Sequence, residues 1–268
     1  MKDIFLLHKI MDKLPRFIFS NLRIVIDLLK CRHTYPIKQY FMLRKQNNQK
    51  VVSVPIKQIN GKKVLARPNT KDFVNLFHVF KDQYHLPPKP LPKKPVIIDL
   101  GSYIGYTIIH LKNLYPESKI IGIEMNRDNY NLAKENIKNF NDCFLLNMAI
   151  STKCGYECYK AEDLSDAYHI VSEKNDNNLV RIPSITIESL IERFKLESID
   201  FLKMDIEGEE IKIFEENLEW MNYVKMLNIE VHGSIQQYTN LKNVIRNHGF
   251  DTEKGKQRMS ILAINNKI

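Results

Sequence analysis

The stretch VIIDLGSYIG, residues 96–105, decides the fold of this chain. Apolar and β-branched residues surround a single aspartate, Asp99, and two glycines, Gly101 and Gly105, follow four residues apart. Apolar residues then recur at helical spacing over residues 106–111. This order is typical of a buried parallel strand, a tight turn and a helix. Because ligands bind at the carboxyl end of such a strand in a doubly wound α/β fold, we expect a ligand-binding turn here.

Beyond this turn, predicted strands and helices alternate to the end of the chain. Such alternation favours a parallel sheet with right-handed crossovers, so we expect a doubly wound, mostly parallel α/β fold. Strands are expected at residues 119–124, 142–150, 199–206 and 224–231, helices at 127–140, 186–194, 209–218 and 237–248, an insertion of short strands at 154–185, and a terminal pair of strands at 249–250 and 260–264.

The upstream part of the chain reads as a helical and hairpin region. Residues 1–46 have the apolar spacing of amphipathic helices, which either lie on an anionic membrane or cover the core of their own domain. Asn60-Gly61 lies between two runs of alternating apolar residues. This dipeptide is a strong hairpin signal and predicts a type I′ turn.

A boundary is expected after this region. Thr70 is placed to cap a helix whose apolar face lies within residues 73–80. Five prolines then fall within residues 86–95, LPPKPLPKKP, which reads as a stiff connector. We therefore expect a basic N-terminal region at residues 1–95 and a cofactor-binding domain at residues 96–268.

Positive charge is concentrated upstream of the glycine turn. Counting Lys and Arg against Asp and Glu, residues 1–50 carry +8, residues 51–95 carry +7 and residues 96–268 carry −6. A basic region on an acidic body suggests an anionic partner, such as a membrane surface, a nucleic acid or a phosphorylated substrate. A solvated lysine-rich face fits the same charge equally well.

Cysteine use and hydropathy bear on the compartment. Four cysteines in 268 residues form no disulfide framework, and the pair Cys154 and Cys158 alone is a weak zinc signal. Charged residues interrupt the N-terminal apolar segments too often for a membrane span, and no small-residue cleavage site follows them. We expect a cytoplasmic protein with reduced thiols, with peripheral contact of its basic region with an anionic membrane as an open alternative.

The glycine spacing separates two classes of cofactor. Glu124 ends the second strand, about twenty residues after the first, where a carboxylate hydrogen-bonds ribose hydroxyls in either class. A dinucleotide site needs GxGxxG, whereas this turn reads GxxxG, and Asp99 ahead of it would repel a pyrophosphate. The same carboxylate suits the ammonium and sulfonium of S-adenosylmethionine, so we expect that cofactor. The third strand ends at Asn147, Met148 and Ala149, which are placed to contact adenine.

Carboxylates also gather at the ends of the fourth and fifth strands. Asp205 and Glu207 are two residues apart, so strand alternation predicts that both point toward the cofactor cleft. Glu230 and His232 form a second same-side pair. We predict that Asp205 and Glu207 line the pocket of a methyl acceptor, with His232, Glu207 or Asp205 as the base. We expect no metal, but in an alternative arrangement these four side chains hold a divalent ion that lowers the pKa of an acceptor hydroxyl.

Six motifs carry a family resemblance. DLGSYIGYT, IGIEMN, NMAIS, SITIESLIERF, IDFLKMDIEGEE and LNIEVHG, with RPNTKDFVNLFHVFKDQY upstream, resemble the FkbM-type S-adenosylmethionine-dependent methyltransferases over residues 64–264. The most specific piece, DFLKMDIEGEE, is close to the family's DFLKIDVEGAE. Two departures stand out, since Ser102-Tyr103 replaces the family's Ala-Asn and Glu209 replaces its alanine.

The resemblance implies a seven-stranded, Rossmann-like methyltransferase sheet with its last strand antiparallel. It implies O-methylation of a hydroxyl on a sugar, glycan, lipid or secondary metabolite, and it extends the cofactor-binding set to Ser102, Tyr103, Met125 and Asn126. One alternative is an RNA methyltransferase that uses the basic region, although no RNA-recognition motif accompanies the charge and we do not expect nucleic acid to bind. Another is a binding protein that keeps the fold without catalysis.

Overall fold

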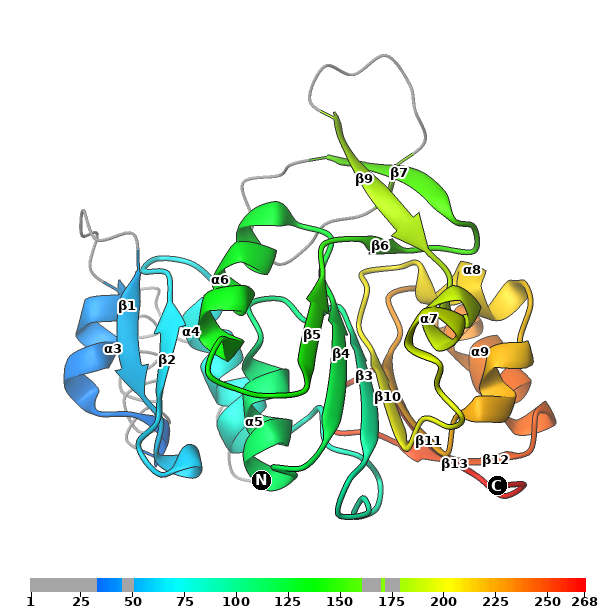
Figure 1. Cartoon of the computed structure of the whole chain (residues 1–268), viewed down its shortest axis with the longest axis horizontal. Helices are drawn as coiled ribbons and strands as arrows, with labels where there is room; N and C mark the ends of the chain where they lie inside the picture. The colour runs from blue at the N-terminus through cyan, green and yellow to red at the C-terminus, as the bar shows by residue number, and fades with distance from the viewer. Residues whose placement is uncertain (1–32, 45–50, 161–169, 172–178) are drawn as a thin grey trace, which may run out of the picture. The chain divides into compact units, whose positions relative to one another are not determined.

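The structure, a computed structural model, describes residues 33–44, 51–160, 170–171 and 179–268 (Figure 1). The chain divides into two compact units, residues 1–69 and 70–268. The sequence placed the boundary at residue 95 instead. Residues 70–95 belong with the second unit because they pack on its sheet, where the Asn228 amide donates to the carbonyls of Tyr84 and Leu86 at 2.8 and 3.1 Å.

The first unit contains the predicted hairpin. It consists of α3 (Ile37–Arg44), β1 (Val52–Pro55), the 3-10 helix η1 (Lys57–Ile59) and β2 (Lys63–Ala66), with β1 and β2 antiparallel. Asn60 and Gly61 both have positive φ, and the Lys62 N–H donates to the Ile59 carbonyl, as the type I′ prediction requires. The first strand ends at Pro55, earlier than expected, because η1 precedes the turn. The helices predicted before residue 33 lie outside the described residues.

The second unit is built on a seven-stranded sheet in the order β12-β13-β11-β10-β3-β4-β5. The strands β3, β4, β5, β10 and β11 are parallel, β13 is antiparallel to β11, and β12 is antiparallel to β13. This arrangement confirms the doubly wound fold class and the antiparallel last strand. The strands are β3 (Val96–Leu100), β4 (Lys119–Ile123), β5 (Cys143–Leu146), β10 (Phe201–Met204), β11 (Met226–Glu230), β12 (Phe250–Lys254) and β13 (Ser260–Asn265).

Helices lie along this sheet, as the alternating sequence pattern predicted (Figure 1). Apolar residues of α7, α8 and α9 form one core cluster with strand residues such as Ile98, Leu202 and Ile229. No helix of the described residues has both the length and the hydropathy to cross a membrane. The helical segments are α4 (Asp72–Phe77), which continues as the π-helix η2 (His78–Asp82), α5 (Tyr106–Leu114), α6 (Arg127–Ile137), α7 (Ile187–Phe194), α8 (Glu210–Glu215), η3 (Glu219–Tyr223) and α9 (Ile235–Asn247).

The predicted insertion of short strands forms a second, four-stranded sheet in the order β6-β9-β7-β8. Its strands are β6 (Ala149–Ile150), β7 (Gly155–Lys160), β8 (Ile170–Val171) and β9 (Leu179–Ile185). β7 and β9 extend away from the main sheet in Figure 1. The chain leaves the main sheet after β5, so the single strand expected at residues 142–150 is in fact two strands in different sheets.

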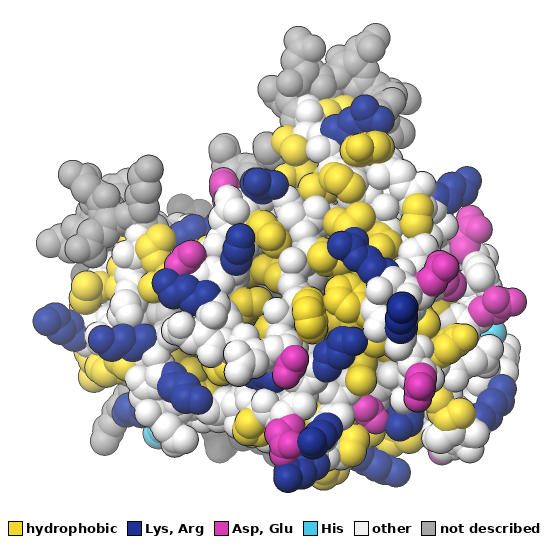
Figure 2. All heavy atoms as spheres, in the orientation of Figure 1, with side chains coloured by type: hydrophobic (Ala, Val, Ile, Leu, Met, Phe, Trp, Pro, Cys, Tyr) yellow, Lys and Arg dark blue, Asp and Glu magenta, His cyan; other side chains and the backbone are white. Residues whose placement is uncertain are grey.

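An apolar patch lies on the face shown in Figure 2, between β5 and α7. There the rings of Phe144 and Phe194 pack edge to face with centroids 5.4 Å apart. The Lys119 ammonium lies 5.9 and 5.5 Å from the two ring centroids. Phe144 is exposed because, among the described strands, β5 pairs only with β4 and forms the edge of the sheet.

Candidate active site

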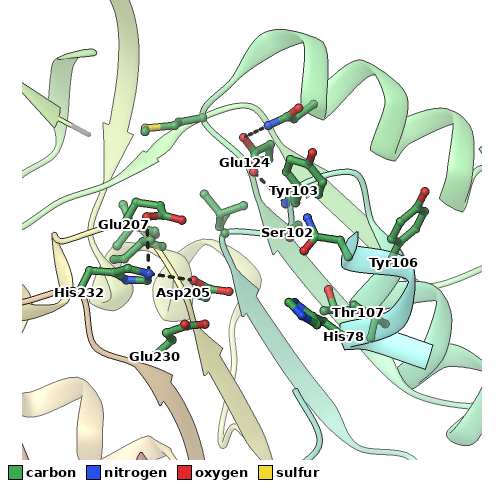
Figure 3. Close-up of a pocket in the computed structure, with 18 of the residues that line it drawn as sticks. His78, Ser102, Tyr103, Tyr106, Thr107, Glu124, Asp205, Glu207, Glu230 and His232 are labelled. Atoms are coloured by element: carbon green, nitrogen blue, oxygen red, sulfur yellow. Dashed lines mark hydrogen bonds and ion pairs between the residues drawn. The ribbon is translucent and has the colours of Figure 1, made fainter. Parts of the chain in front are cut away.

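A cavity of about 400 Å³ opens at the carboxyl ends of the parallel strands. One side is formed by the turn after β3 and the end of β4, and the other by the segments that follow β10 and β11, as Figure 3 shows. This is the position where doubly wound folds bind ligands. The residues that line it include Asn75, His78, Tyr84, Gly101, Ser102, Tyr103, Glu124, Met125, Met148, Ala149, Asp205, Glu207, Glu230 and His232.

The turn after β3 is held by backbone hydrogen bonds to β4. The N–H groups of Gly101 and Ser102 donate to the carbonyl of Ile123 at 3.0 and 2.9 Å. Gly101 has a φ of +78°, and a Cβ there would lie 1.8 Å from the Asp205 carbonyl oxygen, so glycine is required for this approach. Tyr103 also has a positive φ, and its phenol donates to the buried carboxylate of Asp72 at the start of α4.

The Glu124 carboxylate lies on the side of the cavity next to this turn (Figure 3). The Tyr103 N–H donates to its Oε2 at 2.8 Å, and the Asn126 N–H donates to its Oε1 at 2.9 Å. Burial raises the pKa of Glu124 to about 7, and these hydrogen bonds oppose the shift. A carboxylate fixed in this way at the end of the second parallel strand is placed to accept hydrogen bonds from ribose hydroxyls.

The structure separates the predicted cofactor residues into two groups. Seven line the cavity, namely Gly101, Ser102, Tyr103, Glu124, Met125, Met148 and Ala149. Four do not, namely Asp99, Gly105, Asn126 and Asn147. A residue at the carboxyl end of a strand can have a side chain that points away from the cleft. The position of a residue along its strand therefore does not show whether it lines the cavity.

Each of the four residues outside the lining packs against, or hydrogen-bonds to, the elements that form the cavity. Asp99 is fully buried, where Thr107 donates to its carboxylate and the Lys203 ammonium lies 3.1 Å away. Gly105 packs against α6, and the Asn126 side chain caps that helix by accepting from two backbone N–H groups. The Asn147 amide donates to the carbonyls of Glu124 and Met125, at 2.9 Å in both cases.

The three side chains predicted as catalytic, Asp205, Glu207 and His232, lie close together, and Glu230 lines the cavity with them. We call these four residues the acceptor cluster, after the methyl-acceptor pocket that the sequence predicts. The Nε2 atom of His232 lies 3.5 Å from Glu207 Oε2 and 3.9 Å from Asp205 Oδ1 (Figure 3). Glu230 lines the same part of the cavity. The sequence therefore predicted that these side chains lie together. Its reason for Asp205 and Glu207, the alternation of side chains along a strand, is wrong.

Strand alternation does not bring Asp205 and Glu207 together, because β10 ends at Met204. Glu207 has a φ of +57°, a left-handed conformation that is costly for a non-glycine residue. The fully buried carboxylate of Glu210 holds this turn by accepting from the N–H groups of Ile206 and Gly208, both at 2.9 Å. A tight turn fixed by Glu210 thus directs both side chains toward His232.

The charges of the acceptor cluster are mutually dependent. Burial lowers the pKa of His232, but the hydrogen bond and charge of Glu210, with the charges of Glu207 and Asp205, outweigh burial and raise this pKa to about 9. Burial, followed by the charge of Asp205, raises the pKa of Glu230 to about 7. The cluster therefore holds a proton on His232 at neutral pH.

Three side chains that contact the acceptor cluster or its turn are not among the residues that the sequence predicts for the site: Tyr84, Lys203 and Glu210. The Tyr84 phenol donates to Asp205 Oδ2 at 3.4 Å, and the Lys203 ammonium lies 3.6 Å from the same oxygen. Burial raises the pKa of the Tyr84 phenol. Burial lowers the pKa of Lys203, but the charges of Asp99 and Asp205 outweigh this effect and leave it raised. A lysine within an otherwise apolar strand was the signal available for Lys203.

Comparison with known proteins identifies a family. A sequence profile described as the methyltransferase FkbM domain matches residues 99–252. No curated protein sequence matches the chain.

Several solved structures are similar to parts of this chain. One is the methyltransferase FkbM from Methylobacillus flagellatus KT, with 14% identity and a TM-score of 0.45 over 72% of this chain and 54% of that one. Another is M. capricolum TrmK in complex with S-adenosyl-homocysteine, with 13% identity and a TM-score of 0.39 over 68% of this chain and 65% of that one. A third is a putative caffeoyl-CoA O-methyltransferase from Staphylococcus aureus, with 13% identity and a TM-score of 0.39 over 64% of this chain and 76% of that one. The chain therefore spans about half of the length of the first of these proteins and just under two thirds of the second.

Proposed function

Because the chain belongs to the FkbM family of methyltransferases, we propose that it transfers a methyl group from S-adenosylmethionine to a hydroxyl of a neutral, polyhydroxylated acceptor such as a sugar. The observation that carries this proposal is the shared cavity, which joins the Glu124 side to the acceptor cluster. One end fits a nucleoside, and the other end presents carboxylates that accept hydrogen bonds from hydroxyl groups.

The cofactor is S-adenosylmethionine, and the lining residues fit it. Glu124 is placed for the ribose hydroxyls, and its carboxylate is already oriented by two backbone N–H groups. Met125, Met148 and Ala149 add apolar surface beside it, suited to the flat face of adenine. Gly101 and Ser102 also line the cavity, together with Glu124 and the acceptor cluster.

Charge at the acceptor end favours an uncharged acceptor. Asp205, Glu207 and Glu230 border this end of the cavity together with His232. A phosphate or carboxylate on the acceptor would meet these carboxylates at close range and be repelled. Sugar hydroxyls, by contrast, donate hydrogen bonds to ionised carboxylates, which are among the stronger hydrogen bonds in proteins.

The chemistry needs alignment and removal of one proton. Bound S-adenosylmethionine supplies a methyl group on a positively charged sulfur, which becomes a neutral thioether when the new C–O bond has formed. Asp205 and Glu207 would hold the acceptor hydroxyl in line with that methyl group, and alignment of this kind contributes up to about 7–11 kcal/mol in well-oriented systems. The hydroxyl proton would pass to a carboxylate of the acceptor cluster, with His232 fixed beside it by Glu210.

Two measurements test this proposal. Calorimetry with S-adenosylmethionine, with NADH as the comparison, checks the cofactor, and transfer of a labelled methyl group to sugars, lipids and RNA in parallel checks the acceptor. We expect Glu207→Gln and Asp205→Asn to bind the cofactor as the natural chain does but to lower kcat by about 10²-fold or more.

Glu135→Gln is the matched control, because its carboxylate pairs with Lys138 on the exposed surface. Transfer to RNA but not to sugars or lipids would replace this acceptor with the nucleic acid. Cofactor binding with full turnover in both cluster variants would show that the cluster is not the catalytic site.

A further inference from the structure

We infer that Asp205, Glu207 and His232 form a binding site for one divalent cation that accepts mixed nitrogen and oxygen ligands. Each side chain offers one ligand atom, and these three atoms lie within 4.8 Å of one another. All three side chains are partly buried and line the cavity. The role of the cation in catalysis rests on the proposed function, but its binding can be measured without any methyl transfer.

The distances between the ligand atoms suit a cation better than a direct ion pair. The Nε2 atom of His232 lies 3.5 Å from Glu207 Oε2 and 3.9 Å from Asp205 Oδ1. Both separations exceed the roughly 2.7–2.9 Å of a charge-assisted hydrogen bond. Ligands bound to one ion at about 2.1 Å lie about 3.0 Å apart in octahedral geometry and about 3.4 Å in tetrahedral geometry. Small side-chain movements would therefore close these three atoms around one ion.

Side chains outside the ligand set orient two of the three ligands. Glu210 Oε1 lies 3.1 Å from His232 Nδ1, which leaves Nε2 facing the carboxylates. Tyr84 and Lys203 lie near Oδ2 of Asp205, at 3.4 and 3.6 Å, and so leave its Oδ1 facing Nε2. A histidine that donates its second ring N–H to a carboxylate, as Glu210 allows here, is the usual arrangement behind a metal-bound imidazole.

The charge and the open side of the cluster also suit a cation. Lys203 and His232 are surrounded by five carboxylates, those of Asp99, Asp205, Glu207, Glu210 and Glu230. Three protein ligands at a cavity wall leave coordination positions for water or for an acceptor oxygen, as in catalytic metal sites. A cation there would bind the acceptor hydroxyl and make its proton easier to remove.

Manganese is the probe for this site because Mn²⁺ accepts both oxygen and nitrogen ligands and is visible by electron paramagnetic resonance. The full chain, freed of metal by a chelator and kept without cofactor or acceptor, is titrated with Mn²⁺, and the free ion is counted. We expect one ion per chain and at least tenfold weaker binding by Asp205→Asn and Glu207→Gln. Glu135→Gln, the surface control, should bind as the natural chain does, and Mg²⁺, Ca²⁺ and Zn²⁺ are then tested as competitors.

The outcomes separate this inference from the proposed function. No loss of free Mn²⁺ at millimolar metal, or equal binding by all variants, would overturn the cation site. Should a variant fail to fold, the melting temperature of the natural chain decides, because an ion bound to the folded state must raise it. Mn²⁺ binding without methyl transfer to any acceptor would keep the site and overturn the function. Full methyl transfer by a metal-free chain that binds no Mn²⁺ would keep the proposed function and overturn the cation site.

Discussion

Replacing Gly101 with alanine tests whether the cofactor turn and the acceptor cluster form one packed unit. A Cβ at this position would lie 1.8 Å from the carbonyl oxygen of Asp205, well inside the 3.4 Å at which ordinary contact begins. One backbone would therefore have to move by about 1.6 Å, from 1.8 to 3.4 Å. Asp205 cannot move freely, because its N–H donates to the Leu100 carbonyl at 3.1 Å.

The expected cost follows from two terms. Alanine in a left-handed conformation costs about 1–2 kcal/mol, and overpacking a fixed interior adds about 1–3 kcal/mol. Gly101→Ala should therefore lower the free energy of unfolding by about 2–5 kcal/mol. Gly61 is the matched control, because its φ of +75° is close to the +78° of Gly101 and an added Cβ there meets nothing within 4 Å. Gly61→Ala should show the first term alone.

Denaturant titration and calorimetry with S-adenosylmethionine together decide the outcome. Gly101→Ala should bind the cofactor about tenfold or more weakly, equivalent to about 1.4 kcal/mol, because both the turn and Asp205 are displaced. Gly61→Ala should bind as the natural chain does. Equal unfolding free energies in the two variants, with unchanged cofactor affinity in Gly101→Ala, would refute the contact between the turn and Asp205.

Three other predictions concern buried groups. Burial lowers the pKa of His110 to about 4 from an ordinary 6.5, so the unfolded chain binds this proton first as pH falls; the stability of the natural chain in denaturant, relative to that of His110→Phe, should drop by about 1.5–2 kcal/mol between pH 6.5 and 5. Glu124→Gln keeps the size of the side chain but replaces one acceptor oxygen with a donor, and calorimetry should show cofactor affinity about 10–100-fold weaker. Glu210→Gln should lower the unfolding free energy by about 2–3 kcal/mol, because one carboxylate now serves two backbone N–H groups and His232; an unchanged denaturation midpoint would contradict this.

The strand, turn and helix at residues 96–111 could be predicted because each depends on local chemistry. Four apolar residues bury β3 on both faces, and Gly101 and Gly105 supply the positive φ values that the turn needs. The position of Glu124 beside the turn could be predicted for the same reason, since the parallel register with β3 brings the end of β4 there. These are short-range rules that a sequence displays directly.

The acceptor cluster required tertiary information. DIEGEE shows that acidic residues follow β10, but only the folded turn shows that Glu210 is buried and that Glu207 points toward His232. A glutamate in the first turn of a helix reads as a favourable dipole charge, which hides its role as a hydrogen-bond acceptor for the turn. Tyr84 lies 121 residues before Asp205 and beside a proline-rich segment, so no local pattern joins them.

Lys203 contacts residues from both ends of the cavity. Its side chain is only 2% exposed, and its ammonium lies 3.1 Å from Asp99, 3.1 Å from the Gly101 carbonyl and 3.6 Å from Asp205. Asp99 and Gly101 belong to β3 and its turn, whereas Asp205 belongs to the acceptor cluster, so one buried cation holds both. Removing that charge would leave Asp99 buried without its ion-pair partner, a loss that typically costs about 3–5 kcal/mol. The aspartate that the sequence assigned to the cofactor is therefore paired with Lys203, which also lies beside Asp205 of the acceptor cluster.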